Sequence, residues 1–236
     1  MKQLIMCGRN SVLEAVKYNF EIEKIYLAKK ENLRLFENLV PPKMLEVQSN
    51  DFLNKLTKEN HQGFVALIRP ITYCDLPFLI KNMPSNVLIL DHIQDPHNLG
   101  AIIRTANAAG IKDIILPKDN AAQINETVLK ISSGGIINTN FYRVSSLSAT
   151  ISKLQKEGYW AYATTLDQNA LPHTQVEYNK PTIIIVGNEG TGVSKSVLSV
   201  VDQTVYIKQF GNVQSLNVSV ATGIILFDLI NKNDQE

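Results

Sequence analysis

The sequence predicts an α/β fold in which a mainly parallel sheet is covered by helices on both faces. From Val87 onward, short apolar runs alternate with helical segments, which is typical of parallel sheets. A smaller α/β pattern of the same kind precedes it. The composition, 44% hydrophobic and 19% charged over 236 residues, is that of an ordinary globular protein with ample material for a core.

A proline-rich stretch separates the two patterns. Pro70, Pro77 and Pro84 lie in a segment with little periodicity, as in a semi-rigid connection between domains. We therefore expect a first domain over residues 1–70, a linker over 71–86 and a second domain over 87–236.

The first domain is predicted to be a small α/β unit. Apolar spacing suits a helix over residues 10–20, capped by Asn10 or Ser11. Further segments are expected in the order strand, helix, strand, helix, strand, over residues 24–28, 31–39, 44–47, 51–58 (capped at Ser49–Asn50) and 63–68.

The second domain is predicted to contain five strands and a final helix. The helix, over residues 218–230, repeats apolar residues at a helical spacing, so it can pack on the sheet or on a second subunit. The expected strands cover residues 87–90, 114–116, 160–163, 183–186 and 205–207.

Composition and charge exclude several classes of protein. The net charge of +1 argues against a broad, non-specific polyanion binder. Neither a membrane span nor a signal peptide is recognisable, so we expect a cytoplasmic protein. Cys7 and Cys74 form no CxxC pair, and the four histidines are scattered, so no metal site is expected.

Residues 90–104 form the first of three segments whose residues are suited to catalysis or ligand binding. A strand ends at the turn Asp95-Pro96, and a helix is expected from about Asn98 to Gly110. Arg104 points away from the apolar stripe of this helix. It is either a solvated surface arginine or a group that grips a phosphate beside a reaction centre.

Residues 182–194 form the second segment, a buried strand that runs into the glycine-rich turn Gly187-Asn188-Glu189-Gly190-Thr191-Gly192. Glycines let a backbone approach a ligand closely, and free N–H groups there can hold a carboxylate or a ribose. The order differs from the dinucleotide fingerprint. Alone, it is equally a tight turn.

Residues 205–221 form the third segment, in which a strand leads through a long polar loop into the final helix. Ser215 or Asn217 can cap that helix. Capping explains one of these residues and leaves the other, together with the polar loop, to be explained by function.

In this order and spacing, the three segments resemble the signature motifs of the SpoU/TrmH RNA ribose methyltransferases. They match D-x-x-x-D-P-x-N-x-G-x-x-x-R, G-N-E-G-x-G and S-L-N-V-S-V-A. Residues 7–12 and 61–66 are similar to the ends of the family's N-terminal substrate-binding domain, which resembles ribosomal protein L30e. The two-domain layout is most similar to members that methylate a guanosine of large-subunit rRNA.

The resemblance implies a SPOUT fold with a deep trefoil knot, a rare exception to the rule that chains do not thread their own loops. It also implies a homodimer with the active site near the subunit interface, and S-adenosylmethionine bound in the knot mainly by backbone groups. Carried onto this chain, the cofactor-binding positions are Gly187, Ile207 and Leu216.

The residues that the resemblance implies as catalytic are Asn98, Arg104, Glu189, Ser215 and Asn217. Because a guanidinium loses its proton only with difficulty, we assign Arg104 to the phosphate next to the target ribose, where it orients the 2′-hydroxyl. Glu189 is expected to orient Arg104 or its own loop, and the other three to hold ribose, phosphate and loop geometry. The family's third motif usually opens Ile-Pro-Met. Here it reads Ile207-Lys208-Gln209, which bears on loop rigidity and cofactor affinity.

Three alternatives remain open on the sequence. The RNA can be tRNA or another rRNA site, because structured RNA is recognised mostly by shape and backbone. A non-catalytic RNA-binding relative should have lost Arg104 or Asn217, yet both are present. A nicotinamide-dependent enzyme should carry an early G-x-G-x-x-G, which this chain does not.

Overall fold

A computed structural model describes residues 4–167, 169–213 and 215–233. The chain divides into two units: unit 1 contains residues 1–71 and 124–138, and unit 2 contains residues 72–123 and 139–236. Two segments therefore lie elsewhere than the sequence pattern indicates. Residues 124–138 belong with unit 1, and residues 72–86, expected as a linker, belong with unit 2. No described helix combines the length and apolar character that crossing a membrane requires.

Unit 1 is built on a four-stranded sheet in the order β1-β4-β2-β3. The two antiparallel pairs are β1 with β4 and β4 with β2, whereas β2 and β3 are parallel. The elements from the first 71 residues are β1 (Leu4–Cys7), α1 (Arg9–Lys17), β2 (Ile22–Leu27), two 3₁₀ helices (Lys30–Phe36 and Pro42–Met44), β3 (Leu45–Val47), α2 (Asn50–Leu56) and β4 (Phe64–Ile68).

Three details of unit 1 test the expected helix ends. Ser49 caps α2 as predicted, because its hydroxyl accepts a hydrogen bond from Phe52 N at 3.2 Å. The predicted cap of the first helix was wrong: Gly8 stands at that position, without a side-chain cap. The helix expected over residues 31–39 is a 3₁₀ helix that ends at Phe36, whose buried ring anchors it to the core.

The segment 124–138 adds a helix to unit 1 that the sequence pattern did not indicate. Helix α5 (Glu126–Ser132) packs against β1 and buries Val128 and Leu129 completely. Lys130 forms an ion pair with Glu59, which belongs to the first 71 residues of the chain. Unit 1 is therefore completed by residues that come from the middle of the chain.

Unit 2 contains the larger sheet, whose strands pair in the order β7-β6-β5-β10-β8-β11-β9, all of them parallel. This confirms the predicted α/β class with a parallel sheet. Each expected strand is present, whereas β7 and β9 were not predicted. The strands are β5 (Asn86–Asp91), β6 (Asp113–Pro117), β7 (Asn140–Val144), β8 (Trp160–Thr164), β9 (Leu171–Pro172), β10 (Thr182–Gly187) and β11 (Gln203–Tyr206).

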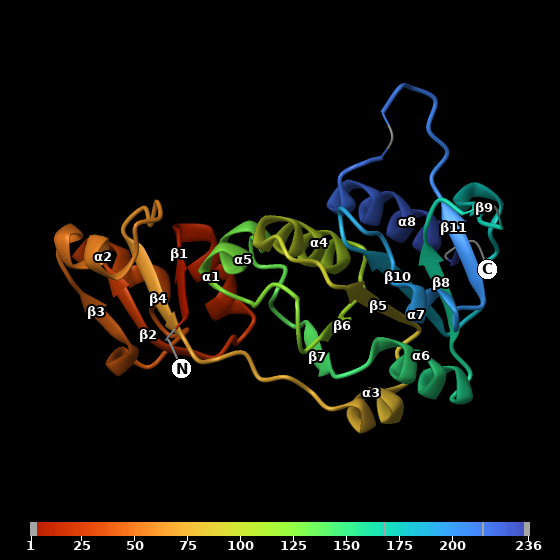
Figure 1. The fold of residues 1–236 in the computed structure, drawn as a ribbon. Coiled ribbons are helices and arrows are strands. Elements are labelled where there is room, and N and C mark those ends of the chain that lie inside the picture. The colour runs from red at the N-terminus through yellow and green to blue at the C-terminus, as the bar shows by residue number, and fades with distance from the viewer. Residues whose placement is uncertain (1–3, 168, 214, 234–236) are drawn as a thin grey trace. The chain divides into compact units, whose positions relative to one another are not determined.

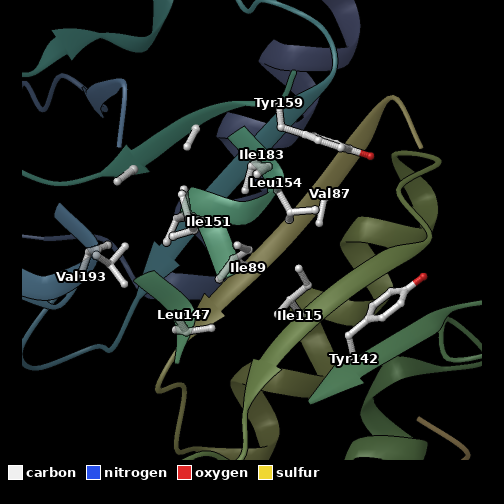
Figure 2. Close-up of a cluster of buried hydrophobic side chains, with 14 of the residues drawn as sticks. Val87, Ile89, Ile115, Tyr142, Leu147, Ile151, Leu154, Tyr159, Ile183 and Val193 are labelled. Atoms are coloured by element: carbon white, nitrogen blue, oxygen red, sulfur yellow. The ribbon is translucent and has the colours of Figure 1, made fainter. Parts of the chain in front are cut away.

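Helices cover both faces of this sheet (Figure 1). Alternate strand residues, such as Ile89 and Ile183, pack against Leu147 and Ile151 of helix α6 in one apolar cluster (Figure 2). The intervening residues face the opposite side, where α4 and α8 pack together and α8 contacts β10. The helices of unit 2 are α3 (Leu76–Asn82), α4 (Pro96–Ala108), α6 (Leu147–Lys156), α7 (Lys195–Leu198) and α8 (Val218–Asn233), with a 3₁₀ turn at His173–Gln175.

Helix α3 and the start of α4 correct two predictions. Helix α3 lies within the expected linker. Asp75 caps it, and Leu79 is fully buried in the apolar cluster. The helix was not predicted because it is short and the nearby prolines indicated a linker. Helix α4 begins at Pro96, two residues before the predicted start, because the Asp95 carboxylate accepts a hydrogen bond from His97 N at 3.0 Å. Gly110 follows α4 with a φ of +75°, the left-handed conformation expected there.

The end of α8 is held to the segment 173–178 by a cluster of polar groups. Lys232 Nζ donates to the carbonyl oxygens of His173 (2.6 Å) and Val176 (3.0 Å) and to the Asp228 carboxylate (2.9 Å). The Tyr178 hydroxyl donates to the same carboxylate at 3.3 Å. Burial, and then the nearby Asp228 charge, raise the pKa of Tyr178, so this hydroxyl remains a donor at neutral pH.

We expect Lys232→Met to destabilise unit 2 by about 2–3 kcal/mol, because it removes three hydrogen bonds and leaves a mostly buried carboxylate without its cation. Chemical denaturation followed by circular dichroism measures the change. Lys156→Met, at an exposed position of α6, is the matched control and should change stability by less than about 0.5 kcal/mol. Equal effects of the two substitutions would contradict the role given to the cluster.

Candidate active site

Three distant segments of unit 2 meet through a chain of side-chain hydrogen bonds. Asn98, in the first turn of α4, donates through Nδ2 to the Glu189 carboxylate at 2.7 Å. Its Oδ1 accepts a hydrogen bond from Asn217 Nδ2 at 3.0 Å. An asparagine amide carries both a donor and an acceptor, so Asn98 links the other two residues. The structure therefore brings together three of the five residues assigned to catalysis.

Asn217 has a second task, at the start of α8. Its Oδ1 accepts hydrogen bonds from Ser219 N at 2.9 Å and Ser219 Oγ at 2.6 Å. These are the bonds of a helix cap, so Asn217 rather than Ser215 takes the capping role. Because the same oxygen is fixed by the helix, the Asn217 amide nitrogen is held in position toward Asn98.

The loop that carries Glu189 is organised by its neighbour Asn188, which the sequence analysis did not single out. Asn188 Nδ2 donates to the His92 carbonyl at 2.9 Å, while Oδ1 accepts from Gly190 N and Thr191 N. Such local side-chain to backbone bonds stabilise turns. Asn188 therefore fixes the Glu189 loop to the end of β5.

Gly187, the last residue of β10, lies where the backbone of Gly192 and Val193, at the end of this loop, passes very close to the strand. A Cβ atom at this position would lie 2.2 Å from both Gly192 C and Val193 N. Only glycine fits such a close approach of two backbones. The residue type is thus required by the path of the chain at this point.

Asp91, at the end of β5, is a buried charge at the base of the site, and the sequence analysis assigned it no role. Its side chain is 1% exposed; Oδ2 accepts a hydrogen bond from Ser194 N at 2.7 Å, and Oδ1 lies 2.5 Å from His92 Nδ1. Buried carboxylates require such partners. Asp91 is the first acid of the D-x-x-x-D-P pattern, which was the signal that could have identified it.

Arg104 lies on α4 with its side chain exposed, and its guanidinium makes no hydrogen bond or ion pair with another described residue. Six helical positions separate it from Asn98, so the two side chains leave α4 on different sides. Its neighbour Thr105 lies at the contact with α8, where a Cβ on Gly223 would be 3.4 Å from Thr105 Cγ2. Within one chain, therefore, Arg104 is not part of the Asn98 network.

The remaining predicted residues lie on the segment between β11 and α8, which projects away from the sheet (Figure 1). Ser215 is exposed, whereas Ile207 and Leu216 are half-buried. Neither Ile207 nor Leu216 forms a backbone hydrogen bond with another described residue. Their main-chain groups are free to bind a ligand, since backbone N–H and C=O groups seek partners.

A pocket of about 180 Å³ is lined by Asp91, His92 and Asp119 together with several serines. A second, of about 170 Å³, lies near Trp160. Neither is lined by Gly187, Ile207 or Leu216.

The chemistry of the assembled groups is that of binding and orientation. Amides, one carboxylate and free main-chain groups can hold a hydroxylated ligand, and an exposed guanidinium can bind a phosphate. Among the described residues no cluster of three or more His, Cys, Asp or Glu side chains could hold a metal ion.

Comparison with known protein families gives two matches that together span nearly the whole chain. Residues 85–227 match the SpoU rRNA Methylase family. Residues 5–74 match the domain described as RNA 2′-O ribose methyltransferase substrate binding. The boundary between the two matches falls at the start of unit 2 and its sheet.

Individual relatives agree with this result. A curated protein of Staphylococcus haemolyticus, described as a TrmH family tRNA/rRNA methyltransferase, is 34% identical, and the alignment covers 100% of this chain and 98% of the relative. Among solved structures, an AdoMet-bound rRNA methyltransferase from Sinorhizobium meliloti superposes with a TM-score of 0.83 at 24% identity, covering 97% and 87% of the two chains.

A second solved structure, the SpoU methyltransferase AviRb of Streptomyces viridochromogenes in complex with AdoMet, gives a TM-score of 0.81 at 20% identity and covers 98% and 91% of the two chains. These likenesses show that the chain has the SPOUT methyltransferase fold, and the family match over residues 5–74 shows the N-terminal substrate-binding domain, both as predicted.

Proposed function

Because this chain belongs to the SpoU/TrmH family of RNA methyltransferases, we propose that it transfers a methyl group from S-adenosylmethionine to a ribose 2′-hydroxyl of structured RNA. One observation carries the proposal. Asn98, Glu189 and Asn217, one from each of the three motifs, are joined in a single hydrogen-bonded network. Three motifs that lie far apart in the sequence thus meet at one place, as the residues of a single active site must.

The residues assigned to the cofactor fit a donor held by main-chain groups. Gly187 lets the backbone of Gly192 and Val193 pass directly beside the end of β10, and the backbone groups of Ile207 and Leu216 have no backbone hydrogen-bond partner among the described residues. S-adenosylmethionine supplies an electrophilic methyl group on a sulfonium. We assign the three residues to its binding.

Arg104 is assigned to the RNA, as a phosphate-binding group that orients the ribose hydroxyl. A guanidinium offers planar, paired donors to a phosphate. The adjacent phosphate would accept the hydroxyl proton while the 2′-oxygen bonds to the methyl carbon and the bond from that carbon to the sulfonium sulfur breaks, which releases S-adenosylhomocysteine. Glu189 holds Asn98, and Ser215 and Asn217 hold the ribose side of the site.

A homodimer completes this site in our proposal, because Arg104 does not reach the Asn98 network within one chain. Helix α8, beside Arg104's helix, exposes Val220 (51%) and Phe227 (43%), which lie two helical turns apart on one face. We assign this exposed face to a second copy, which places the guanidinium of one protomer at the site of its partner.

We expect Phe227→Asp to convert the dimer to a monomer and to reduce methyl transfer by at least about tenfold, because a buried, unpaired charge is costly at an interface. Light scattering coupled to gel filtration measures the mass. Tyr18→Asp, at an exposed aromatic of unit 1, is the control and should leave the mass unchanged. A Phe227→Asp protein that remains dimeric, or a wild-type monomer with full activity, would disprove the assignment.

The substrate we propose is a guanosine of large-subunit rRNA, with unit 1 binding the RNA and the enzyme acting in the cytoplasm. The two-domain layout, similar to RlmB, favours rRNA; the alternative is tRNA, since the S. haemolyticus relative is described as a tRNA/rRNA methyltransferase. Ribose-methylation mapping of total RNA, with and without the gene, identifies the nucleotide. A single site lost from 23S rRNA supports the proposal. A site lost from tRNA establishes the alternative, and unchanged RNA contradicts both.

A further inference from the structure

The segment between β11 and α8 carries an aromatic ring that the rest of the described chain leaves uncovered. Phe210 is 89% exposed, the highest value among the exposed large hydrophobic side chains, and Val213 is 63% exposed. Exposed apolar surface is unfavourable in water. Because this ring lies on a segment of the candidate active site, we expect a binding partner to cover it.

The immediate surroundings of Phe210 are cationic and polar. Lys208 Nζ lies over the ring, 5.3 Å from its centroid, and Gln209 and Asn212 flank it in sequence. Lysine is depleted at the core of protein interfaces, which argues against a second protein copy as the occupant. An aromatic face combined with a cation is the arrangement that binds unpaired nucleotides, through base stacking and phosphate contact.

The location of Phe210 ties it to the site of methyl transfer. Asn217, on the same segment, hydrogen-bonds Asn98 at 3.0 Å. The intervening chain can span at most roughly 25 Å when fully extended. A base that contacts Phe210 thus belongs to the target nucleotide or to one a few positions away along the RNA.

We propose that Phe210 stacks on an unpaired base of the RNA substrate close to the methylated ribose, with Lys208 binding an adjacent phosphate. Phe210 is then a positioning residue that selects targets in single-stranded loops over paired helices. This inference rests on the proposed function, because it requires RNA as the substrate.

The test compares Phe210→Ala, Phe210→Leu and Phe210→Trp in methyl transfer to an in-vitro transcript of 23S rRNA and to bulk tRNA. We expect Ala and Leu to raise the KM for the RNA that is methylated by roughly 5- to 100-fold, since stacking depends on the ring, and Trp to remain within about twofold of wild type. Calorimetric affinity for S-adenosylmethionine and the molecular mass should be the same in all four proteins.

A direct readout uses the fact that the chain contains one tryptophan, Trp160. In a Trp160→Phe background, Phe210→Trp places the fluorophore on the segment, and stacking on a base should quench its emission when the methylated RNA is added.

The outcomes separate the inference from the function. If wild type methylates RNA but Phe210→Leu matches it, or if Phe210→Ala instead weakens S-adenosylmethionine binding or lowers the mass, the stacking role is overturned while the function stands. If the wild-type chain methylates neither RNA, the proposed function fails and the inference falls with it.

Discussion

Arg104→Ala is expected to reduce the rate of methyl transfer by about 10²- to 10³-fold, the usual cost of removing one charge-stabilising group from a reaction centre. The side chain is exposed, so its loss should not change the melting temperature. Single-turnover transfer of a radiolabelled methyl group to RNA measures the rate. Arg104→Lys should recover only part of it, because an ammonium does not provide the paired, planar donors of a guanidinium.

Two controls make the Arg104 result decisive. Lys153→Ala removes an exposed cation from α6, on the other face of the sheet, and should leave the rate within about twofold of wild type. The molecular mass of Arg104→Ala should equal that of wild type, since the apolar face of α8 is unchanged. Full activity in Arg104→Ala would refute the role of this residue, and a lowered melting temperature would assign it to structure instead.

Gly187→Ala is expected to destabilise unit 2 by about 3 kcal/mol or more, because the added methyl group would lie 2.2 Å from two backbone atoms. Neither atom belongs to a flexible side chain, so the loop crossing itself must move, which makes the cost larger than that of ordinary overpacking. For a chain of this size the change corresponds to a fall in melting temperature of roughly 6–12 °C. Differential scanning calorimetry measures it.

Gly190→Ala, in the same loop, is the matched control for stability. A Cβ there would meet only the Asn188 side-chain oxygen, at 3.5 Å, which is an ordinary contact. We expect its melting temperature to lie within about 2 °C of wild type, which corresponds to less than about 1 kcal/mol. Equal, small effects of both substitutions would show that the loop crossing at Gly187 is not tightly packed.

The strands of unit 2 could be predicted from the sequence because local patterns determine them. Buried parallel strands are continuous apolar runs, and those at Ile183–Val186 and Val87–Leu90 stand out without reference to any other part of the chain. The α/β class followed from their alternation with helices. Strand β9, with two residues, is too short for any periodicity to indicate it.

Helix α5 could not be predicted in its place, because its position depends on contacts with remote residues. It packs on β1 and pairs Lys130 with Glu59, 71 positions earlier. A short amphipathic helix shows which face is apolar but not which surface will cover it. For the same reason the sequence assigned residues 124–138 to the second domain.

The candidate site was identified from the resemblance of three motifs to a known family, whereas its geometry required the structure. Asn98 lies 91 positions from Glu189 and 119 from Asn217, and motif resemblance alone suggested that they meet. The supporting bonds of Asp91 and Asn188 follow from the paths of the loops, which no local pattern reports. Arg104 shows the converse. Its exposure was predicted from helical spacing, whereas its approach to the other site residues depends on the homodimer that we propose.

Identification of the methylated nucleoside tests the central claim most directly. RNA labelled by the purified chain with radioactive S-adenosylmethionine is digested to nucleosides and separated by chromatography. The network that Asn98 forms with Glu189 and Asn217 is proposed to present a ribose oxygen, so all of the label should elute with a 2′-O-methylnucleoside. Label in a base-methylated nucleoside, or no label in any RNA under conditions where the chain binds the cofactor, would contradict the account.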